Sequence, residues 1–156
     1  MQRKVRDDVA AVERAMVAIR RRQSRRTLAS LAAGQGAAAD AALAALLDAV
    51  EGEQESGRPS TVTSLTAVLG VDQPRASKLV ARATDQGLLR READPRDGRR
   101  SLLVLTAAGH ALLESVHRLR RGVFERAMAD WPDRDRADFA RLLTRFVDAL
   151  TQDPAR

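Results

Sequence analysis

Two short helical segments separated by a glycine turn constrain the fold of this 156-residue chain more than any other feature of its sequence. Thr61 is a good N-cap for a helix that ends at Leu69, and Gly70 permits the sharp turn that follows. Asp72 is a second N-cap, for a helix predicted over 73–86. Two helices joined by a glycine-containing turn of about three to four residues form a helix-turn-helix.

The two sides of the predicted helix 73–86 differ in chemistry. Its inward positions are apolar: Ala76, Leu79, Val80 and Ala83. In the shorter helix before it, the positions expected to face inward are Leu65, Val68 and Leu69. The outward positions of 73–86 are candidate DNA contacts: Gln73, Arg75, Ser77, Lys78 and Arg82. Arginine suits this role because its planar guanidinium grips phosphates and guanine edges with two hydrogen bonds.

A basic hairpin is predicted after the second helix. The runs 88–92 and 101–105 are compatible with strands, and they flank the segment Asp94 to Arg100, whose Asp-Pro and Asp-Gly pairs are turn signals. Three arginines would lie at the tip of this hairpin: Arg96, Arg99 and Arg100. A basic hairpin beside a helix-turn-helix forms a wing, so the segment 94–100 is expected to contact nucleic acid.

The flanking segments are predicted to be helices with apolar faces. Segment 5–33 has a heptad stripe that favours packing against another helix: Val5, Val9, Val12, Met16 and Ile19. Gly34 and Gly36 are expected to break it, and Asp40 to cap a helix over 41–50 that precedes a loop at 51–59. Thr106 should cap a helix over 107–129, and a last helix over 133–150 has one wide apolar face.

Composition excludes several classes of protein. The chain has no cysteine, so disulfides, thiolate catalysis and thiolate-bound metals are excluded. No catalytic triad, carboxylate pair or phosphate-binding glycine loop is discernible, so neither an enzyme nor a cofactor is predicted. The sequence has no apolar run of membrane-spanning length and no apolar stretch after its charged start, which predicts a cytoplasmic protein without a membrane partner. The net charge is +6 and arginine dominates it, which favours nucleic acid but is also a habit of GC-rich coding.

Residues 60–114 resemble the MarR family, the regulators named for multiple antibiotic resistance. The resemblance consists of a capped helix followed by motifs in a fixed order: Leu69-Gly70-Val71, Gly87-Leu88-Leu89, Asp94-x-x-Asp97-x-Arg99 and Leu105-Thr106-x-x-Gly109. It covers about a third of the chain, and the flanks agree in layout only. Three positions depart from the family pattern, namely Ser64, Thr66 and Ala83. Ser64 replaces the usual glutamate of a capping box, which predicts a weaker cap.

The resemblance implies a mainly α-helical fold with a small β-hairpin wing. A dimerisation helix (1–36) precedes a winged helix-turn-helix lobe (37–106), and a long helix with a C-terminal dimerisation helix (107–156) follows. The implied function is that of a homodimeric transcriptional regulator, expected to be a repressor of an inverted-repeat operator in double-stranded DNA. Helix 73–86 would enter the major groove and the wing the minor groove, with a small-molecule effector as a further partner.

The resemblance also assigns roles within the wing. Arg96 and Arg99 carry over as DNA contacts. Asp97 is expected to pair with Arg99 or with a nearby backbone amide and so to hold the tip. Asp94 and Gly98 complete the residues that shape the wing.

Three alternatives remain open from the sequence. A non-specific architectural nucleic-acid binder would explain the arginines but not the mixed polar face of 73–86. A helical interaction module would explain the flanks but not the wing. A zinc-responsive regulator of the same fold would use His110, Glu114 and His117, whose spacing puts them on one helix face. The sequence offers no fourth ligand, so no metal site is predicted.

Overall fold

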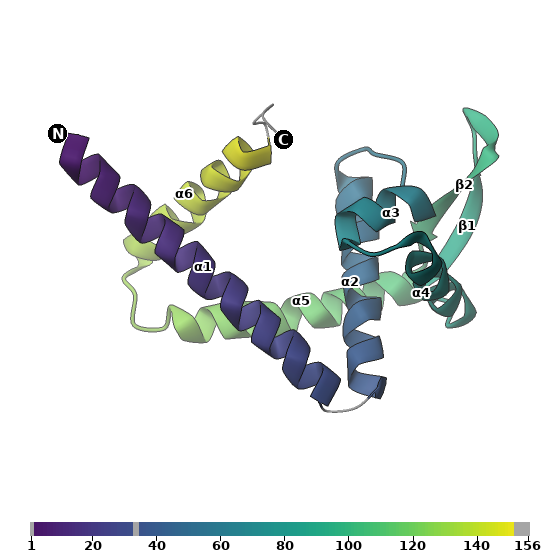
Figure 1. The fold of residues 1–156 in the computed structure, drawn as a ribbon, viewed down its shortest axis with the longest axis horizontal. Helices are drawn as coiled ribbons and strands as arrows, with labels where there is room; N and C mark the ends of the chain where they lie inside the picture. Colours follow the sequence, from purple (N-terminus) through teal and green to yellow (C-terminus); the bar gives the residue numbers. More distant parts are fainter. Residues whose placement is uncertain (1, 33–34, 152–156) are drawn as a thin grey trace. The chain divides into compact units, whose positions relative to one another are not determined.

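The computed structural model describes residues 2–32 and 35–151. Figure 1 shows their elements in chain order: α1 (Gln2–Ala32), α2 (Gln35–Glu55), α3 (Val62–Leu69), α4 (Gln73–Asp85), β1 (Leu89–Asp94), β2 (Asp97–Leu105), α5 (Ala107–Ala127) and α6 (Asp133–Thr151). The mainly helical fold with a β-hairpin wing is therefore confirmed. Within these described parts, no helix combines the length and apolar character needed to cross a membrane.

The chain divides into two compact units, Met1–Leu113 and Glu114–Arg156. The boundary expected between lobe and long helix, 106/107, precedes the observed one at 113/114 by about two helical turns. The difference arises because the start of α5 packs with the lobe: Leu113 is buried in the same core as the helix-turn-helix. The dimerisation roles of 1–36 and 107–156 stay predictions.

The core of the first unit is built from α2, α3, α4, the hairpin and the start of α5. Its buried members are Leu43, Leu46, Leu47, Val50, Leu65, Val80, Ala83, Leu88, Leu89, Leu103, Leu105 and Leu113. The residues from α2 recur at helical spacing, so one face of that helix is buried. Full burial of each leucine contributes about 1.5–3 kcal/mol. This core fixes the platform from which α4 and the wing project.

Helix α2 is longer than predicted. It begins at Gln35 and ends at Glu55, so Gly36 lies within it, Asp40 is not its N-cap, and residues 51–55 are helical instead of forming a loop. The alanine-rich sequence explains the extension at the N-terminal end, because alanine has the highest helix propensity and outweighs the cost of about 1 kcal/mol for an internal glycine. Asp40 instead pairs with Arg82 of α4.

The caps of the helix-turn-helix are confirmed. Thr61 caps α3, Asp72 caps α4 by accepting a hydrogen bond from the Arg75 amide at 2.8 Å, and Gly70 ends α3 with a left-handed φ of 63°. The inward position of Val68 was wrong, since this side chain is 52% exposed. The short helix packs through the stripe Val62, Leu65 and Leu69, and Val68 lies to one side of it.

The wing is a tight antiparallel hairpin with a bulge between Ala93 and Asp94. Its strands reach further than predicted, so Pro95 and Arg96 form the turn and Gly98 lies within β2. Of the two predicted turn signals, Asp94-Pro95 marks the observed turn and Asp97-Gly98 does not, since Gly98 has no positive φ. The observed turn is favoured because proline suits the second position of a β-turn and the preceding aspartate can accept a local hydrogen bond.

The wing is tied to the helices at its base. The Leu103 amide donates to the Ser60 carbonyl at 2.8 Å. Thr106 caps α5, as predicted, by accepting from the Gly109 amide at 3.1 Å, and its hydroxyl donates to the Gly87 carbonyl at 2.6 Å. A Cβ on Gly109 would lie 2.2 Å from the carbonyl oxygen of Leu88, so only glycine fits. The hairpin therefore leaves the lobe in a fixed direction.

The outer helices present exposed apolar side chains. On α6 these are Phe139, Leu142, Leu143, Val147 and Leu150. On α1 they are Val9, Val12, Met16 and Ile19, while Val5 lies outside the residues whose side chains are described. Trp131 and Phe139 pack edge to face, with ring centroids 5.4 Å apart. Both faces need a partner surface to be buried.

Candidate nucleic-acid interface

Helix α4 presents a polar face away from the core. Ala76, Val80 and Ala83 are buried and Leu79 is half-buried, as predicted. Four of the five predicted contact residues are exposed: Gln73, Arg75, Ser77 and Lys78. Within the described part of the chain, the guanidinium of Arg75 and the ammonium of Lys78 have no ion-pair partner. Their charges are therefore available to a ligand.

The fifth predicted contact residue, Arg82, is engaged within the protein. Its Nη2 atom lies 2.8 Å from Oδ1 of Asp40 on α2. Sequence reasoning placed Arg82 correctly on the outer side of α4 but missed this partner, which is 42 residues away. No local spacing could have found it.

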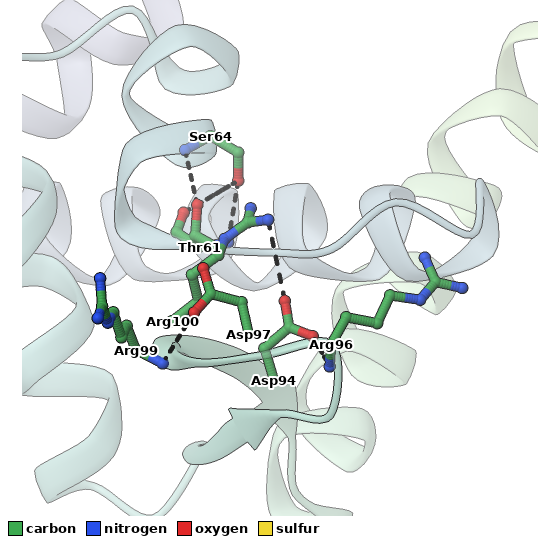
Figure 2. Close-up of polar contacts among 7 residues, drawn as sticks. All are labelled: Thr61, Ser64, Asp94, Arg96, Asp97, Arg99 and Arg100. Carbon is green, nitrogen blue, oxygen red and sulfur yellow. Dashed lines mark hydrogen bonds and ion pairs between the residues drawn. The ribbon is translucent and has the colours of Figure 1, made fainter.

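The wing tip is held by two aspartates that accept backbone hydrogen bonds (Figure 2). Asp94 Oδ1 accepts from the Arg96 amide at 2.9 Å, and Asp97 Oδ1 accepts from the Arg99 amide at 3.1 Å. The expectation that Asp97 pairs with a nearby amide is thus confirmed. Figure 2 shows the side chains of Arg96 and Arg99 pointing away from each other. The aspartates shape the tip and leave both guanidinium groups exposed.

Asp94 is the more deeply placed of the two aspartates. It is 7% exposed, and its Oδ2 lies 3.9 Å from Nη1 of Arg100. Arg100 therefore extends from the wing toward the start of α3 (Figure 2). The carboxylate of Asp94 therefore contacts both the turn, through the Arg96 amide, and the guanidinium of Arg100.

A hollow of about 420 Å³ lies between the start of α3 and the wing. Its lining residues are Thr61, Val62, Thr63, Arg91, Arg100 and Ser101. Two guanidinium groups and several hydroxyls beside a helix N-terminus can hold a phosphate group. Sequence reasoning missed Arg91, although strand alternation was a usable signal: Arg90 and Glu92 pair with each other, and Arg91 points to the opposite side.

The predicted polar face of α5 is occupied by ion pairs. Glu114 Oε1 lies 2.5 Å from Arg121 Nη2 and 3.9 Å from Arg118 Nη1. His110 is exposed and His117 half-buried. A metal held by His110, Glu114 and His117 would have to displace both arginines. Metal binding by these three residues stays an untested alternative to the prediction of no metal ligands.

The geometry defines a winged helix-turn-helix, and comparisons with known proteins agree. Residues 42–100 match the model of the MarR family. The uncharacterized HTH-type transcriptional regulator YxaD of Bacillus subtilis (strain 168) is 30% identical over 92 residues, which cover 59% of this chain. The chain spans 64% of the length of that relative.

Solved structures share the fold. A MarR family protein from Bacillus stearothermophilus superposes with a TM-score of 0.65 at 20% identity, covering 92% of this chain and 96% of that one. The S. aureus MepR–DNA complex gives a TM-score of 0.53 at 17% identity, with 88% and 96% covered. Residues 42–100, which include the winged helix-turn-helix up to the wing tip, are thus similar to the MarR family, in agreement with the sequence motifs.

Proposed function

We propose that this protein is a homodimeric transcriptional regulator that binds a specific inverted repeat in double-stranded DNA, and that it acts as a repressor. The observation that carries the proposal is the outer face of α4 next to a basic wing. There, capped helix geometry presents exposed Arg75 and Lys78, which have no ion-pair partner among the described residues. The MepR–DNA complex, which shares the fold, adds support. The protein is proposed to have no catalytic activity.

Helix α4 would read bases in the major groove. In helix-turn-helix proteins the N-terminal residues of the recognition helix contact base edges. Gln73, Arg75, Ser77 and Lys78 occupy the first two turns of α4, and glutamine and arginine can each make paired hydrogen bonds to adenine and guanine. Each such contact discriminates between bases by about 1–3 kcal/mol.

The wing would bind the backbone and the minor groove. Arg96 and Arg99 are exposed at the tip, where two aspartates fix the chain around them. Arg100 and Arg91 line the hollow at the start of α3, which suits a phosphate of the same strand. These contacts would set the position and salt dependence of binding more than its sequence preference.

Two copies would assemble through the outer helices. The exposed apolar faces of α1 and α6 would each be buried by a second copy. Two-fold symmetry would place two recognition helices about 34–36 Å apart, which is one turn of DNA, and so select an inverted repeat. A small-molecule effector that shifts this spacing would release the DNA.

The test begins with duplexes enriched from a randomised pool by the wild-type protein. Fluorescence anisotropy then compares the enriched duplex with a scrambled duplex of equal composition. We expect the enriched duplex to contain an inverted repeat and to bind at least about 10³-fold more tightly at physiological salt. Equal binding of both duplexes would instead identify a non-specific architectural protein. Absence of binding to either duplex would overturn the proposal.

A further inference from the structure

An ion pair connects α2 to the helix that we assign to the major groove. Arg82 Nη2 donates to Asp40 Oδ1 at 2.8 Å. The arginine side chain is 33% exposed and the aspartate side chain 73% exposed. The pair is therefore open to solvent, and within the described part of the chain one N–H group of the guanidinium is engaged. Pairs of this kind contribute about 0–1 kcal/mol to stability, so stability is a weak reason for its presence.

The position of Arg82 gives the pair a different significance. Arg82 follows Arg75 by seven residues and Lys78 by four, so all three lie on one face of α4. Arg82 is about 10 Å further along the helix axis than Arg75. It therefore forms the C-terminal end of the basic stripe, beyond the N-terminal residues that contact base edges, and we expect it to face the sugar-phosphate backbone.

Among the described residues, the carboxylate of Asp40 has one polar partner, the guanidinium of Arg82. Asp40 lies inside α2, which begins at Gln35, so it does not cap that helix. Its carboxylate is largely exposed and touches the basic stripe at one atom. A negative charge beside a DNA-facing arginine opposes the approach of a phosphate, because it cancels the charge of the guanidinium and repels the phosphate directly.

We propose that Asp40 restrains Arg82 in the free protein, and that a DNA phosphate replaces Asp40 on binding. This inference rests on the proposed function, since it concerns the same DNA-binding face. Phosphate can accept two parallel hydrogen bonds from a guanidinium, whereas Asp40 accepts one. The exchange is therefore favourable, but Asp40 lowers its free-energy gain. The affinity for DNA is therefore lower with Asp40 than it would be without this carboxylate.

The experiment measures DNA affinity of four variants of the full chain. Asp40→Asn removes the charge and keeps the shape, Arg82→Ala removes the restrained group, and the double variant combines the two. Asp138→Asn is the matched control, because Asp138 pairs with Arg141 at 3.0 Å on α6, away from α4 in sequence, and its loss changes net charge equally. Each is titrated with the enriched and the scrambled duplex at several salt concentrations.

We expect Asp40→Asn to bind the enriched duplex about three- to tenfold more tightly than the wild type at low salt, as one surface charge pair would give. The slope of log K against log salt should stay close to that of the wild type, because Arg82 contacts a phosphate in both complexes, whereas Arg82→Ala should lower it by about 0.9. The Arg82→Ala background should abolish this gain, and Asp138→Asn should change affinity less than twofold. Equal melting temperatures would show that all four variants are folded.

Three results would overturn the restraint. Asp40→Asn could match Asp138→Asn, which would make Asp40 irrelevant to DNA. It could weaken binding, which would mean that Asp40 orients Arg82 for the phosphate. The gain could persist without Arg82, which would reduce the effect to long-range charge. A wild-type protein that binds neither duplex would overturn the proposed function and this inference with it, and that outcome is visible before any variant is compared.

Discussion

Ser64 of α3 donates a hydrogen bond to the buried carboxylate of Glu53 on α2, with 3.0 Å between Ser64 Oγ and Glu53 Oε2. The same hydroxyl accepts from the Thr61 amide at 2.9 Å, while the Ser64 amide donates to Thr61 Oγ1 at 3.1 Å. Ser64 thus completes the capping box in place of the usual glutamate, and Glu53 holds the serine hydroxyl from a second helix. The prediction of a weaker cap from Ser64 missed this second partner.

The first prediction concerns this network. Ser64→Ala should lower the free energy of unfolding by about 1–3 kcal/mol, because it removes the acceptor for the Thr61 amide and leaves Glu53, which is 4% exposed, without its donor. Chemical denaturation measures this change. Thr63→Ala, at an exposed neighbouring position, is the control. Equal effects of the two substitutions would show that the network adds nothing.

The second prediction uses two glycines with opposite surroundings. Gly109→Ala should destabilise the protein by at least about 2 kcal/mol, because the new Cβ would collide with the Leu88 carbonyl even though alanine favours helices by about 1 kcal/mol. Gly98→Ala should change stability by no more than about 0.5 kcal/mol, since open space surrounds that position. Thermal unfolding compares the two. A stable Gly109→Ala protein would contradict the packing described at the base of the wing.

The third prediction separates base reading from backbone binding. Arg75→Ala should weaken the enriched duplex more than the scrambled one, because a base contact is lost. Arg99→Ala should weaken both duplexes and lower the slope of log K against log salt by about 0.9 for each phosphate contact removed. Anisotropy titrations at several salt concentrations measure both effects. The assignment fails if Arg99→Ala leaves the slope unchanged while Arg75→Ala weakens both duplexes equally.

The fourth prediction ranks the two aspartates of the wing. Asp94→Ala should weaken binding to any duplex by about tenfold, since it removes the acceptor for the Arg96 amide and the partner of Arg100. Asp97→Ala should have a smaller effect, because Asp97 is exposed and accepts one hydrogen bond at the tip. Gel shift or anisotropy decides the order. A larger effect of Asp97→Ala would reverse the assignment of the structuring residue.

The fifth prediction tests assembly. Leu143→Glu and Val147→Glu place charges on the apolar face of α6 and should convert dimers into monomers or insoluble protein. Sizing with light scattering gives the mass in solution. Arg145→Glu, at an exposed polar position on the same helix, should leave the dimer intact. Dimers that survive both apolar-to-charged substitutions would locate the interface elsewhere.

The features that the sequence could predict depend on interactions between residues close together in the chain. Caps at Thr61, Asp72 and Thr106 were predictable, because a cap joins residues three positions apart and depends on side-chain type. The inner face of α4 was predictable from helical spacing. The extension of α2 through Gly36 was not, since local glycine signals were outweighed by the alanine-rich run around them.

The missed features of the site all depend on partners distant in sequence. The pairing of Arg82 with Asp40 and that of Ser64 with Glu53 join separate helices. The sequence offered two turn signals in the wing, and the choice of Pro95-Arg96 over Asp97-Gly98 goes with the strand register. The hollow that includes Arg91 exists only once the hairpin packs beside α3. Such features can be identified only from the folded structure.

The wing is a two-stranded sheet, and this has a consequence for aggregation. A hairpin has outer edges with backbone groups that could pair with the strands of another molecule. Arginines lie along both strands, from Arg90 and Arg91 on β1 to Arg99 and Arg100 on β2, and a bulge distorts the register near the tip. The arginines of two wings repel each other because their charges are alike. The bulge also disrupts the hydrogen-bonding register that a strand of a second molecule would need. The side chains that we assign to the DNA backbone therefore also protect the free protein from self-association through its strands.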